Sequence, residues 1–468
     1  MSSSMSGQDA YDPQTLTVKG TISALIALGR IPFASEVPGW ALFGCLLSSQ
    51  IFSTTTLSTG FLRNLDWWVT LQSMLVTWGT NVAINYGNEY FDYDLDRPGQ
   101  VTAIKKDMEA RQALNKSKSS NGDGTDGSQA IKGTTKVKEE NAKLYANTTR
   151  IIHDGTFPPW TALACSAVWQ AGLIALILSS RFTDPTLHPK ANKHSNHYWR
   201  PGFGGTPFKG LGIYIGIVCT ILSHSYVGPP FRLHYHGWGE LVSALFLTPV
   251  ALIFGMVAHY TATTGKAVSF SDIFPSSYPT RSGFTLDRQL WTLIGAVYLL
   301  QQARILVMHI NDIEADIRGG KRTFVSRVGH ETAKNLYALC NLVSLGLFAS
   351  FAASLTSSSS SNGMFLRVGG SRLSDTSNTA FVSVWLAGLT LVLSYSIPAW
   401  SITYKALVAE IPANKELSAK SSGTTTDGLI PTVSMGNVAI LVSMQTLITP
   451  VVLSVTCLAA GFVASKLS

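Results

Sequence analysis

Charged residues are scarce in this chain. Only 13% of its 468 residues are Asp, Glu, Lys or Arg, whereas 46% are apolar. A soluble domain of ordinary composition carries about 25% charged residues. The length alone would allow two or three soluble domains, but the shortage of charge favours one large membrane domain with polar inserts.

Signatures of several other protein classes are missing. The five cysteines form no CxxC pair and all lie in apolar stretches, so neither a zinc site nor a disulfide framework is indicated. No basic stripe is interleaved with aromatic residues, so the net charge of +8 predicts contact with anionic lipid or phosphate, and no nucleic-acid partner. The first fifteen residues resemble neither a secretory signal nor a mitochondrial transit peptide.

Long apolar stretches are plentiful, and a helix of about 20 such residues crosses a bilayer. Their number predicts an all-α, multi-pass membrane protein with about nine transmembrane helices, in which the lipid bilayer is a partner. The predicted spans are 38–58, 68–91, 157–180, 207–226, 238–259, 289–310, 333–356, 380–404 and 435–464.

Polar segments interrupt this pattern and hold too few apolar residues to form a core. Residues 1–37 are assigned to an N-terminal tail and interfacial segment, and residues 38–465 to the membrane domain. Disordered inserts within the domain are predicted at about 107–147, 181–206, 354–378 and 411–430.

Basic residues gather in the loops that follow the second and sixth spans. Lys105 and Lys106 belong to the first of these loops, and Lys321 and Arg322 to the second. The positive-inside rule places both loops in the cytosol or in its equivalent in an organelle. The pattern does not choose between a mitochondrial and an endoplasmic reticulum membrane.

An acidic cluster ends the second span, in the stretch NYGNEYFDYDLDRPG at residues 85–99. Asn88, Asp92 and Asp96 are spaced four residues apart, so they share one face if the helix continues. Carboxylates at this spacing repel each other and destabilise a helix modestly. Their placement at the mouth of a membrane helix therefore calls for a compensating cation.

A second acidic cluster ends the sixth span, in MHINDIEADIRGGKRTF at residues 308–324. Asp312 and Asp316 repeat the four-residue spacing, and Lys321 and Arg322 follow directly. Mg²⁺ prefers oxygen ligands and is often shared between carboxylates and substrate phosphates. The two clusters together predict a diphosphate held through magnesium at the membrane surface, with basic side chains on the remaining phosphate oxygens.

Other interpretations of the clusters are open at this point. A single acidic pair at a helix end is usually no more than a pair of side chains exposed to water. A second matching pair on the same predicted side of the membrane weakens that interpretation. Calcium is disfavoured because the spacing and glycine of an EF-hand are missing. A transporter with membrane carboxylates is a competitor, although that class usually has inverted repeats and helices broken near the middle of the membrane.

Three stretches together resemble the UbiA superfamily of intramembrane prenyltransferases. The first is the N-E-Y-F-D-Y-D-L-D motif, and the second is D-I-E-A-D-I-R-G-G-K-R-T after the sixth span. The third is YVGPPFRLHYHGWGELVSALFLTPV at residues 226–250, between them. This stretch and the GKRT sequence resemble the corresponding stretches in the branch of the family that prenylates 1,4-dihydroxy-2-naphthoate to make menaquinone.

The resemblance implies a helical bundle around a central cavity and a magnesium-dependent transfer. An isoprenyl diphosphate would ionise, and an aromatic small molecule would accept the prenyl group. The motif positions assign magnesium to Asp92, Asp96, Asp312 and Asp316, with Asp92 and Asp312 as catalytic residues. They assign diphosphate to Asn88, Arg232, Lys321 and Arg322, and substrate contacts to Asn85, Tyr226 and Glu240.

Two positions depart from the pattern of that branch. His309 lies in a run where Asn-Asn-x-Arg is usual, and His234 stands where a lysine is common. Both changes leave the acceptor open among dihydroxynaphthoate, hydroxybenzoate, homogentisate and a secondary-metabolite phenol. The prenyl chain length is open as well. A non-catalytic binding or regulatory protein of the same fold is a further alternative, although all four motif aspartates are present.

Overall fold

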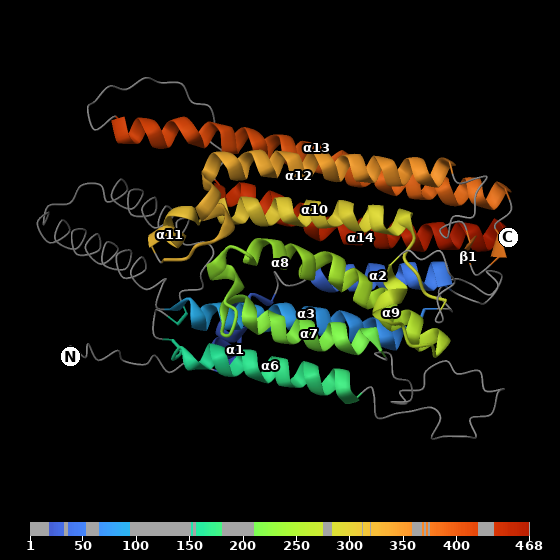
Figure 1. Ribbon diagram of the computed structural model, residues 1–468, viewed down its shortest axis with the longest axis horizontal. Coiled ribbons are helices and arrows are strands. Elements are labelled where there is room, and N and C mark those ends of the chain that lie inside the picture. Colours follow the sequence, from blue (N-terminus) through green and yellow to red (C-terminus); the bar gives the residue numbers. More distant parts are fainter. Residues whose placement is uncertain are drawn as a thin grey trace, which may run out of the picture. The chain divides into compact units, whose positions relative to one another are not determined.

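The structure of the protein is a computed structural model that shows a bundle of long helices (Figure 1). The residues that it describes are 18–31, 36–52, 65–93, 151–152, 156–179, 210–274, 283–310, 312–318, 320–357, 367–368, 371–372, 375–419 and 435–467.

Within the described residues, each of the predicted spans is largely helical. The helices that correspond to them are α2 (Glu36–Phe52), α3 (Trp67–Phe91), α6 (Trp160–Ser179), α7 (Leu211–Val227), α8 and α9 (Gly239–Leu245 and Ala251–Thr264), α10 (Arg288–Ile310), α12 (Phe324–Ser357), α13 (Asp375–Ala419) and α14 (Met435–Leu467).

Shorter elements lie between or before these helices. Within the described ranges they are α1 (Val18–Leu28), η5 (Leu233–His236), the π-helical turn η6 (Phe246–Val250), η7 (Phe270–Ile273), α11 (Ile313–Arg318) and the two-residue strands β1 (Arg367–Val368) and β2 (Ser371–Arg372).

The protein is an all-α, multi-pass membrane bundle, as the composition predicts. Six helical segments are long and apolar enough to cross a bilayer, and all of them lie within the described residues. The count of nine stays a prediction. Most residues of the predicted inserts lie outside the described ranges, but 354–357, 375–378 and 411–419 are helical. The six segments are Trp160–Leu178, Gly239–Thr264, Arg288–Ile310, Phe324–Thr356, Thr376–Val408 and Ile440–Lys466.

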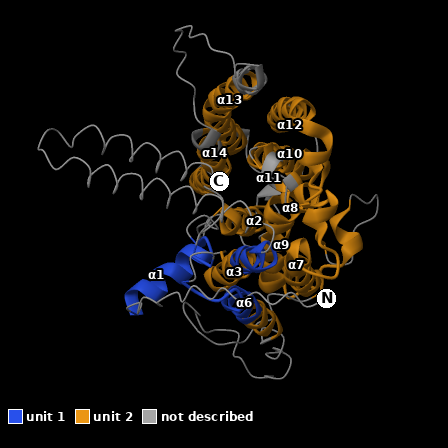
Figure 2. Cartoon of the chain, turned by 90° about the vertical axis from the view of Figure 1, so that its left-hand side faces the viewer, with its two compact units in different colours: residues 1–32, 82–168 blue, residues 33–81, 169–468 orange. Residues whose placement is uncertain are grey.

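The chain divides into two compact units (Figure 2). Unit 1 comprises residues 1–32 and 82–168, and unit 2 comprises residues 33–81 and 169–468. The first acidic motif therefore belongs to unit 1, and the second belongs to unit 2.

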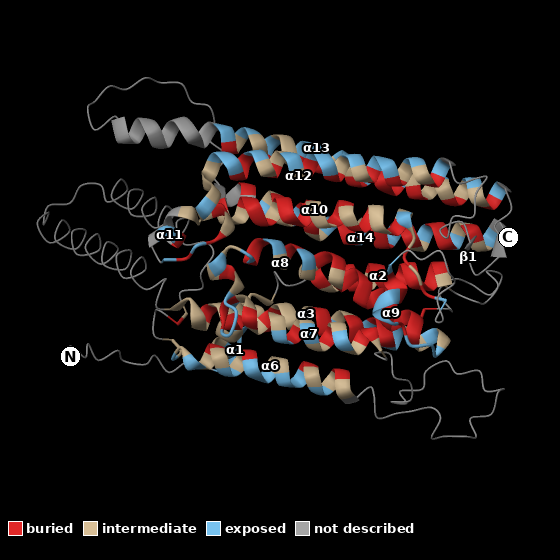
Figure 3. Ribbon diagram, viewed as in Figure 1, coloured by how far each residue is buried: buried red, intermediate tan, exposed pale blue. Residues whose placement is uncertain are grey.

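The core of unit 2 is built from α2, α9, α10, α12, α13 and α14. Its buried surface lies between the helices, and apolar side chains on the outer faces of α12 and α14 are exposed (Figure 3). Large aromatic side chains fill the centre, where Phe43 and Phe351 both lie against the ring of Trp385. An apolar exterior of this kind suits contact with lipid chains.

Glycine permits the closest helix contact in this core, between α2 and α9. A Cβ atom added to Gly44 would lie 2.1 Å from the carbonyl oxygen of Leu252, and one added to Gly255 would lie 2.2 Å from that of Ala41. Small residues at such crossings let two helix backbones approach within a membrane, where no hydrophobic effect drives their association. The pair therefore sets the spacing of α2 and α9.

A buried acid joins three helices of unit 2. Glu36, in the first turn of α2, accepts hydrogen bonds from Arg304 and Gln301 of α10, the latter at 3.2 Å. Its second oxygen accepts a hydrogen bond of 2.9 Å from Thr446 of α14. The Glu36 residue is only 4% exposed, so these partners replace the water that its charge has lost.

Candidate active site

The second acidic motif follows the end of α10. Asp312 directly precedes α11 and Asp316 lies within it, and the Asp316 amide donates to the Asp312 carbonyl at 2.8 Å. The helix closes at Gly320, which has a positive φ of 74°. The Lys321 amide then donates to the Asp316 carbonyl at 2.8 Å, so the turn folds the basic residues back toward the acidic pair.

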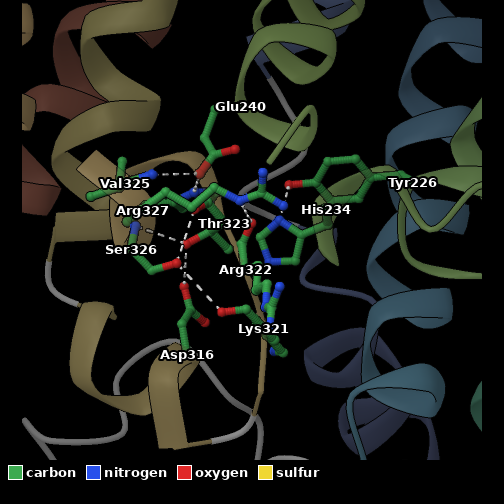
Figure 4. A network of polar contacts seen from close by, with 11 residues as sticks. Tyr226, His234, Glu240, Asp316, Lys321, Arg322, Thr323, Val325, Ser326 and Arg327 are labelled. Atoms are coloured by element: carbon green, nitrogen blue, oxygen red, sulfur yellow. Dashed lines mark hydrogen bonds and ion pairs between the residues drawn. The ribbon is translucent and has the colours of Figure 1, made fainter. Parts of the chain in front are cut away.

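Asp316 is the more buried of the two aspartates, and polar side chains lie around its carboxyl group (Figure 4). The Thr323 hydroxyl donates to its Oδ2 atom at 3.0 Å. Burial raises the pKa of Asp316 to about 6, and the charge of Asp312 acts in the same direction. Lys321, His309 and the Thr323 hydrogen bond oppose that rise. A carboxylate held in this way gains more from a bound cation than a solvated one does.

Two basic residues of unit 2 lie over the ring of one tyrosine, Tyr235. The Arg232 guanidinium lies 5.8 Å from the centre of the Tyr235 ring, and the Lys321 ammonium lies 6.0 Å from it. Arg232 has a left-handed backbone with φ 45°, which lets η5 begin directly after it. Arg322 is exposed. Two cationic side chains, those of Arg232 and Lys321, thus share Tyr235 as a neighbour, and Lys321 follows the second acidic motif.

Tyr226 and Glu240 reach the same region from α7 and α8. The Tyr226 hydroxyl lies 3.1 Å from His234 Nδ1. Gly239 makes this approach possible, because a Cβ atom there would lie 2.7 Å from the His234 Cα atom. Burial, assisted by His309 and Lys321, holds the pKa of His234 well below its ordinary value, so the ring is neutral at physiological pH.

Glu240 connects the start of α8 with the second motif. Its Oε1 atom lies 3.0 Å from His309 Nδ1 and accepts the Val325 amide at 3.3 Å. The His309 ring in turn lies edge-on to His234, with 5.1 Å between the ring centres. Figure 4 shows Glu240 and His234 facing the stretch from Asp316 to Arg327, which includes Lys321.

The first acidic motif is described within unit 1. The Asp92 amide donates to the Asn88 carbonyl at 2.9 Å, at the end of α3. The Asn85 amide group donates to the Gly29 carbonyl at 3.1 Å, so this predicted substrate residue also ties α3 to the segment after α1. Asp96 lies outside the described residues.

A neighbouring acid of this motif is already paired. Glu89 accepts a hydrogen bond of 2.9 Å from Arg30, and the Tyr86 hydroxyl donates to the Leu25 carbonyl at 2.8 Å. These contacts fix the end of α3 against α1.

The residues present fit a hard divalent cation. In unit 2, Asp312 and Asp316 carry carboxylate oxygens, the donors that Mg²⁺ prefers, and in unit 1 Asp92 carries the same kind of donor. The Oδ1 atom of Asn88 is buried and has no hydrogen-bond partner among the described residues. An unsatisfied buried acceptor costs about 1–3 kcal/mol, and a cation or its bound water would remove that cost. Within the described ranges no three His, Cys, Asp or Glu residues form a metal-binding group by themselves.

Sequence reasoning missed two residues of this region. Thr323 belongs to the GKRT sequence, but its hydrogen bond to Asp316 follows only from the turn at Gly320. Tyr235 gives no signal in the sequence, because one of its two cations is 86 positions away. The Glu240–His309 contact spans 69 positions and has no sequence signal either.

Comparisons with known proteins give one partial similarity. No protein-family model matches the chain. A 2-carboxy-1,4-naphthoquinone phytyltransferase of Synechocystis sp. is 26% identical over 133 residues. The match covers 28% of this chain and 34% of the relative, so the chain spans about a third of the relative's length.

Proposed function

We propose that this chain is a magnesium-dependent intramembrane prenyltransferase. It would transfer a polyprenyl group from an isoprenyl diphosphate to an aromatic quinone precursor such as 1,4-dihydroxy-2-naphthoate. The observation that carries the proposal is the placement of Asp312, Asp316, Lys321 and Arg232 together beside the end of a membrane helix. The similarity to a phytyltransferase supports the same reaction class.

The chemistry requires a leaving group to depart as an anion. The bond between the allylic carbon and the diphosphate oxygen breaks, an aromatic carbon forms a new bond to the allylic carbon, and the ring loses a proton. Magnesium, when bound, would neutralise negative charge on the leaving diphosphate. Asp92, Asp96, Asp312 and Asp316 would hold it.

The basic residues complete the stabilisation of the leaving group. Lys321, Arg232 and Arg322 would donate to the phosphate oxygens that carry the developing charge, with Asn88 supporting the first motif. Preorganised donors in a site with little water contribute strongly, because they need no reorganisation during the reaction. Apolar and aromatic walls would keep water from the allylic cation, and π faces favour positive charge.

The test uses purified protein in lipid. Labelled geranylgeranyl diphosphate is incubated with a panel of hydroxylated aromatic acids, with and without Mg²⁺, and both diphosphate release and prenylated product are measured. The proposal expects product only with Mg²⁺, and dihydroxynaphthoate as an acceptor would identify the branch. Product with another phenol keeps the reaction and changes the acceptor. The absence of diphosphate release from every donor would contradict the proposal.

A further inference from the structure

The turn between α9 and α10 carries a cluster of aromatic side chains on its surface. Phe270 is the first residue of η7 and Phe274 is the residue after it, and they are 66% and 44% exposed. Their ring centres lie 5.2 Å apart, and the Phe274 ring stacks on that of Trp291 with 5.9 Å between the ring centres. We call these three residues the η7 patch. A contiguous exposed apolar cluster of this kind is typical of an interaction surface.

Hydrogen bonds hold the turn that carries the η7 patch in a defined conformation. Ser269 and Asp272 form a capping box, in which the Ser269 amide donates to Asp272 Oδ2 at 3.0 Å. The indole N–H of Trp291 donates to the Ile273 carbonyl at 3.2 Å, so this ring is bound to the turn. The Ile273 side chain is buried, whereas the neighbouring Phe274 is exposed. The exposed rings therefore belong to an ordered turn that directs them away from the core.

The ends of two membrane helices place the η7 patch at the bilayer surface. α9 ends at Thr264 and α10 begins at Arg288, and both belong to segments long and apolar enough to cross a bilayer. A turn between such ends lies where the acyl chains meet the lipid head groups. Tryptophan is enriched at this level, and apolar rings combined with basic residues are the pattern of an interfacial anchor. The exposed Lys266 and Arg288 supply the basic residues on either side of the turn.

We propose that the η7 patch inserts into the bilayer interface and anchors the start of α10 there. Its partner is the lipid surface, with the rings among the first carbons of the acyl chains and with Lys266 and Arg288 at the phosphate groups. α10 contains 23 residues, so it is about 34 Å long, close to the thickness of the hydrocarbon core. An anchor at Trp291 therefore fixes the level at which the opposite end of α10, followed by Asp312, leaves the membrane. This inference is independent of the proposed function.

Depth-dependent fluorescence quenching of Trp291 tests the anchor. The full chain is placed in bilayers whose acyl chains carry bromine either near the head group or near the chain end, and the signal of Trp291 is the difference between the wild type and Trp291→Phe. The shallow bromine should quench this signal at least about twofold more strongly than the deep bromine, and iodide in the water should quench it weakly.

Three outcomes of this measurement would overturn the proposal. Quenching of Trp291 by iodide but by neither lipid would place the patch in water. Protection from all three quenchers would show that protein covers the patch. Stronger quenching by the deep bromine would place the ring inside the hydrocarbon core, below the interface.

The substitution Phe270→Ser provides the second arm, because Phe270 is the most exposed ring of the patch. Shallow quenching of Trp291 should fall, and iodide quenching should rise about twofold, because the turn loses an inserted ring. In thicker bilayers the quenching of the wild type should stay constant, whereas that of Phe270→Ser should drift as the helix adjusts to the mismatch.

Ala267→Ser changes an exposed residue of the same turn outside the patch and is the matched control, which should behave as the wild type does. Identical quenching of the wild type and Phe270→Ser in every bilayer would show that the patch is no anchor. If Phe270→Ser does not fold, the quenching profile of the wild type decides the question.

Discussion

Tyr235 lies between two cations that the proposed mechanism assigns to the diphosphate. A cation over an aromatic face gains about 0.5–2 kcal/mol. Tyr235→Leu should therefore raise the KM for the prenyl diphosphate severalfold, with little change in the KM for the acceptor. Tyr235→Phe keeps the ring face and should resemble the wild type. Equal donor KM values in both variants would show that the ring does not position the cations.

Asp316 gives the proposed magnesium site a dependence on pH. Its pKa of about 6 means that protons compete with the cation as the pH falls through 6. The magnesium concentration for half-maximal binding should rise below that pH and level off above about 7. Isothermal titration with Mg²⁺ from pH 5 to 8 measures this dependence. A flat profile would show that Asp316 does not bind the ion.

The substitution Thr323→Val tests the Asp316 carboxyl group by removing its hydrogen-bond donor. The Thr323 hydrogen bond favours ionised Asp316, so its removal should raise the pKa of Asp316 further. The rise in the required magnesium concentration should then begin at a higher pH than in the wild type. An unshifted profile would mean that the hydroxyl does not contribute to the charge state of Asp316.

The sequence predicted the acidic and basic residues of the site but not the side chains that surround them. Asp312 and Lys321 were recognisable because charge at the end of a membrane helix is costly and therefore conspicuous, and Arg232 was assigned only through the family resemblance. Tyr235 and Thr323 are ordinary residue types, and their roles depend on which atoms the fold brings near. Such contacts are set by loop geometry, which hydropathy and spacing do not encode.

Elements of the bundle were predictable for a different reason. A bilayer demands about 20 apolar residues per helix, so the predicted segments match α6, α10 and α14 closely. The π-helical turn at Phe246–Val250 was not predicted. It contains Pro249, which lacks an amide donor, and the helix widens locally there. The extension of α13 to Ala419 was also missed, because residues 411–419 are not apolar enough to be recognised as a span.

At the crossing of α2 and α9, Gly255→Ala should destabilise the protein. Its new methyl group would collide with the Ala41 carbonyl oxygen, and overpacking of this kind costs about 1–3 kcal/mol. Gly346→Ala in α12 is the matched control, because no atom lies within 4 Å of its added Cβ. Thermal unfolding in mild detergent should show a lower midpoint only for Gly255→Ala. Equal midpoints would indicate that the crossing relaxes freely.

The Glu36 contacts that join α2, α10 and α14 predict a larger loss of stability when Glu36 is replaced. Glu36→Ala leaves Arg304 buried without its partner, and breaking a buried pair from one side costs about 3–5 kcal/mol. The double variant Glu36→Ala/Arg304→Met removes the uncompensated charge and should recover part of the loss. Unfolding midpoints of the three proteins measure this. A single variant as stable as the wild type would contradict the structural role of the pair.

At the scale of the whole molecule, the charged residues of the proposed site lie at the ends of membrane helices. The outer surface is apolar, with Leu339 and Leu342 of α12 and Val451 and Val455 of α14 exposed. The second acidic motif instead follows the end of α10, where the proposed mechanism would have the diphosphate head group and the aromatic acid approach from water. The isoprenoid tail of the donor would remain among the lipids. This division of environments is what a reaction between an apolar donor and a polar acceptor requires.

The all-α membrane class and the positions of the apolar helices were predictable from the sequence, because both depend on average properties of long segments. Asp92 belongs to unit 1 and Asp312 to unit 2. The joint action of the two motifs on one diphosphate is therefore a proposal that enzymology has to test.

The most direct test measures magnesium-dependent diphosphate release and prenylated product for Asp92→Ala and Asp312→Ala in lipid. Glu331→Gln is the control, because Glu331 is a carboxylate in α12 with 59% of its side chain exposed. We expect each aspartate variant to insert and fold normally but to lose at least about a hundredfold in turnover, on the order of the loss of one key stabilising group. The control should match the wild type. Turnover that survives both aspartate substitutions would contradict the proposed role of these aspartates.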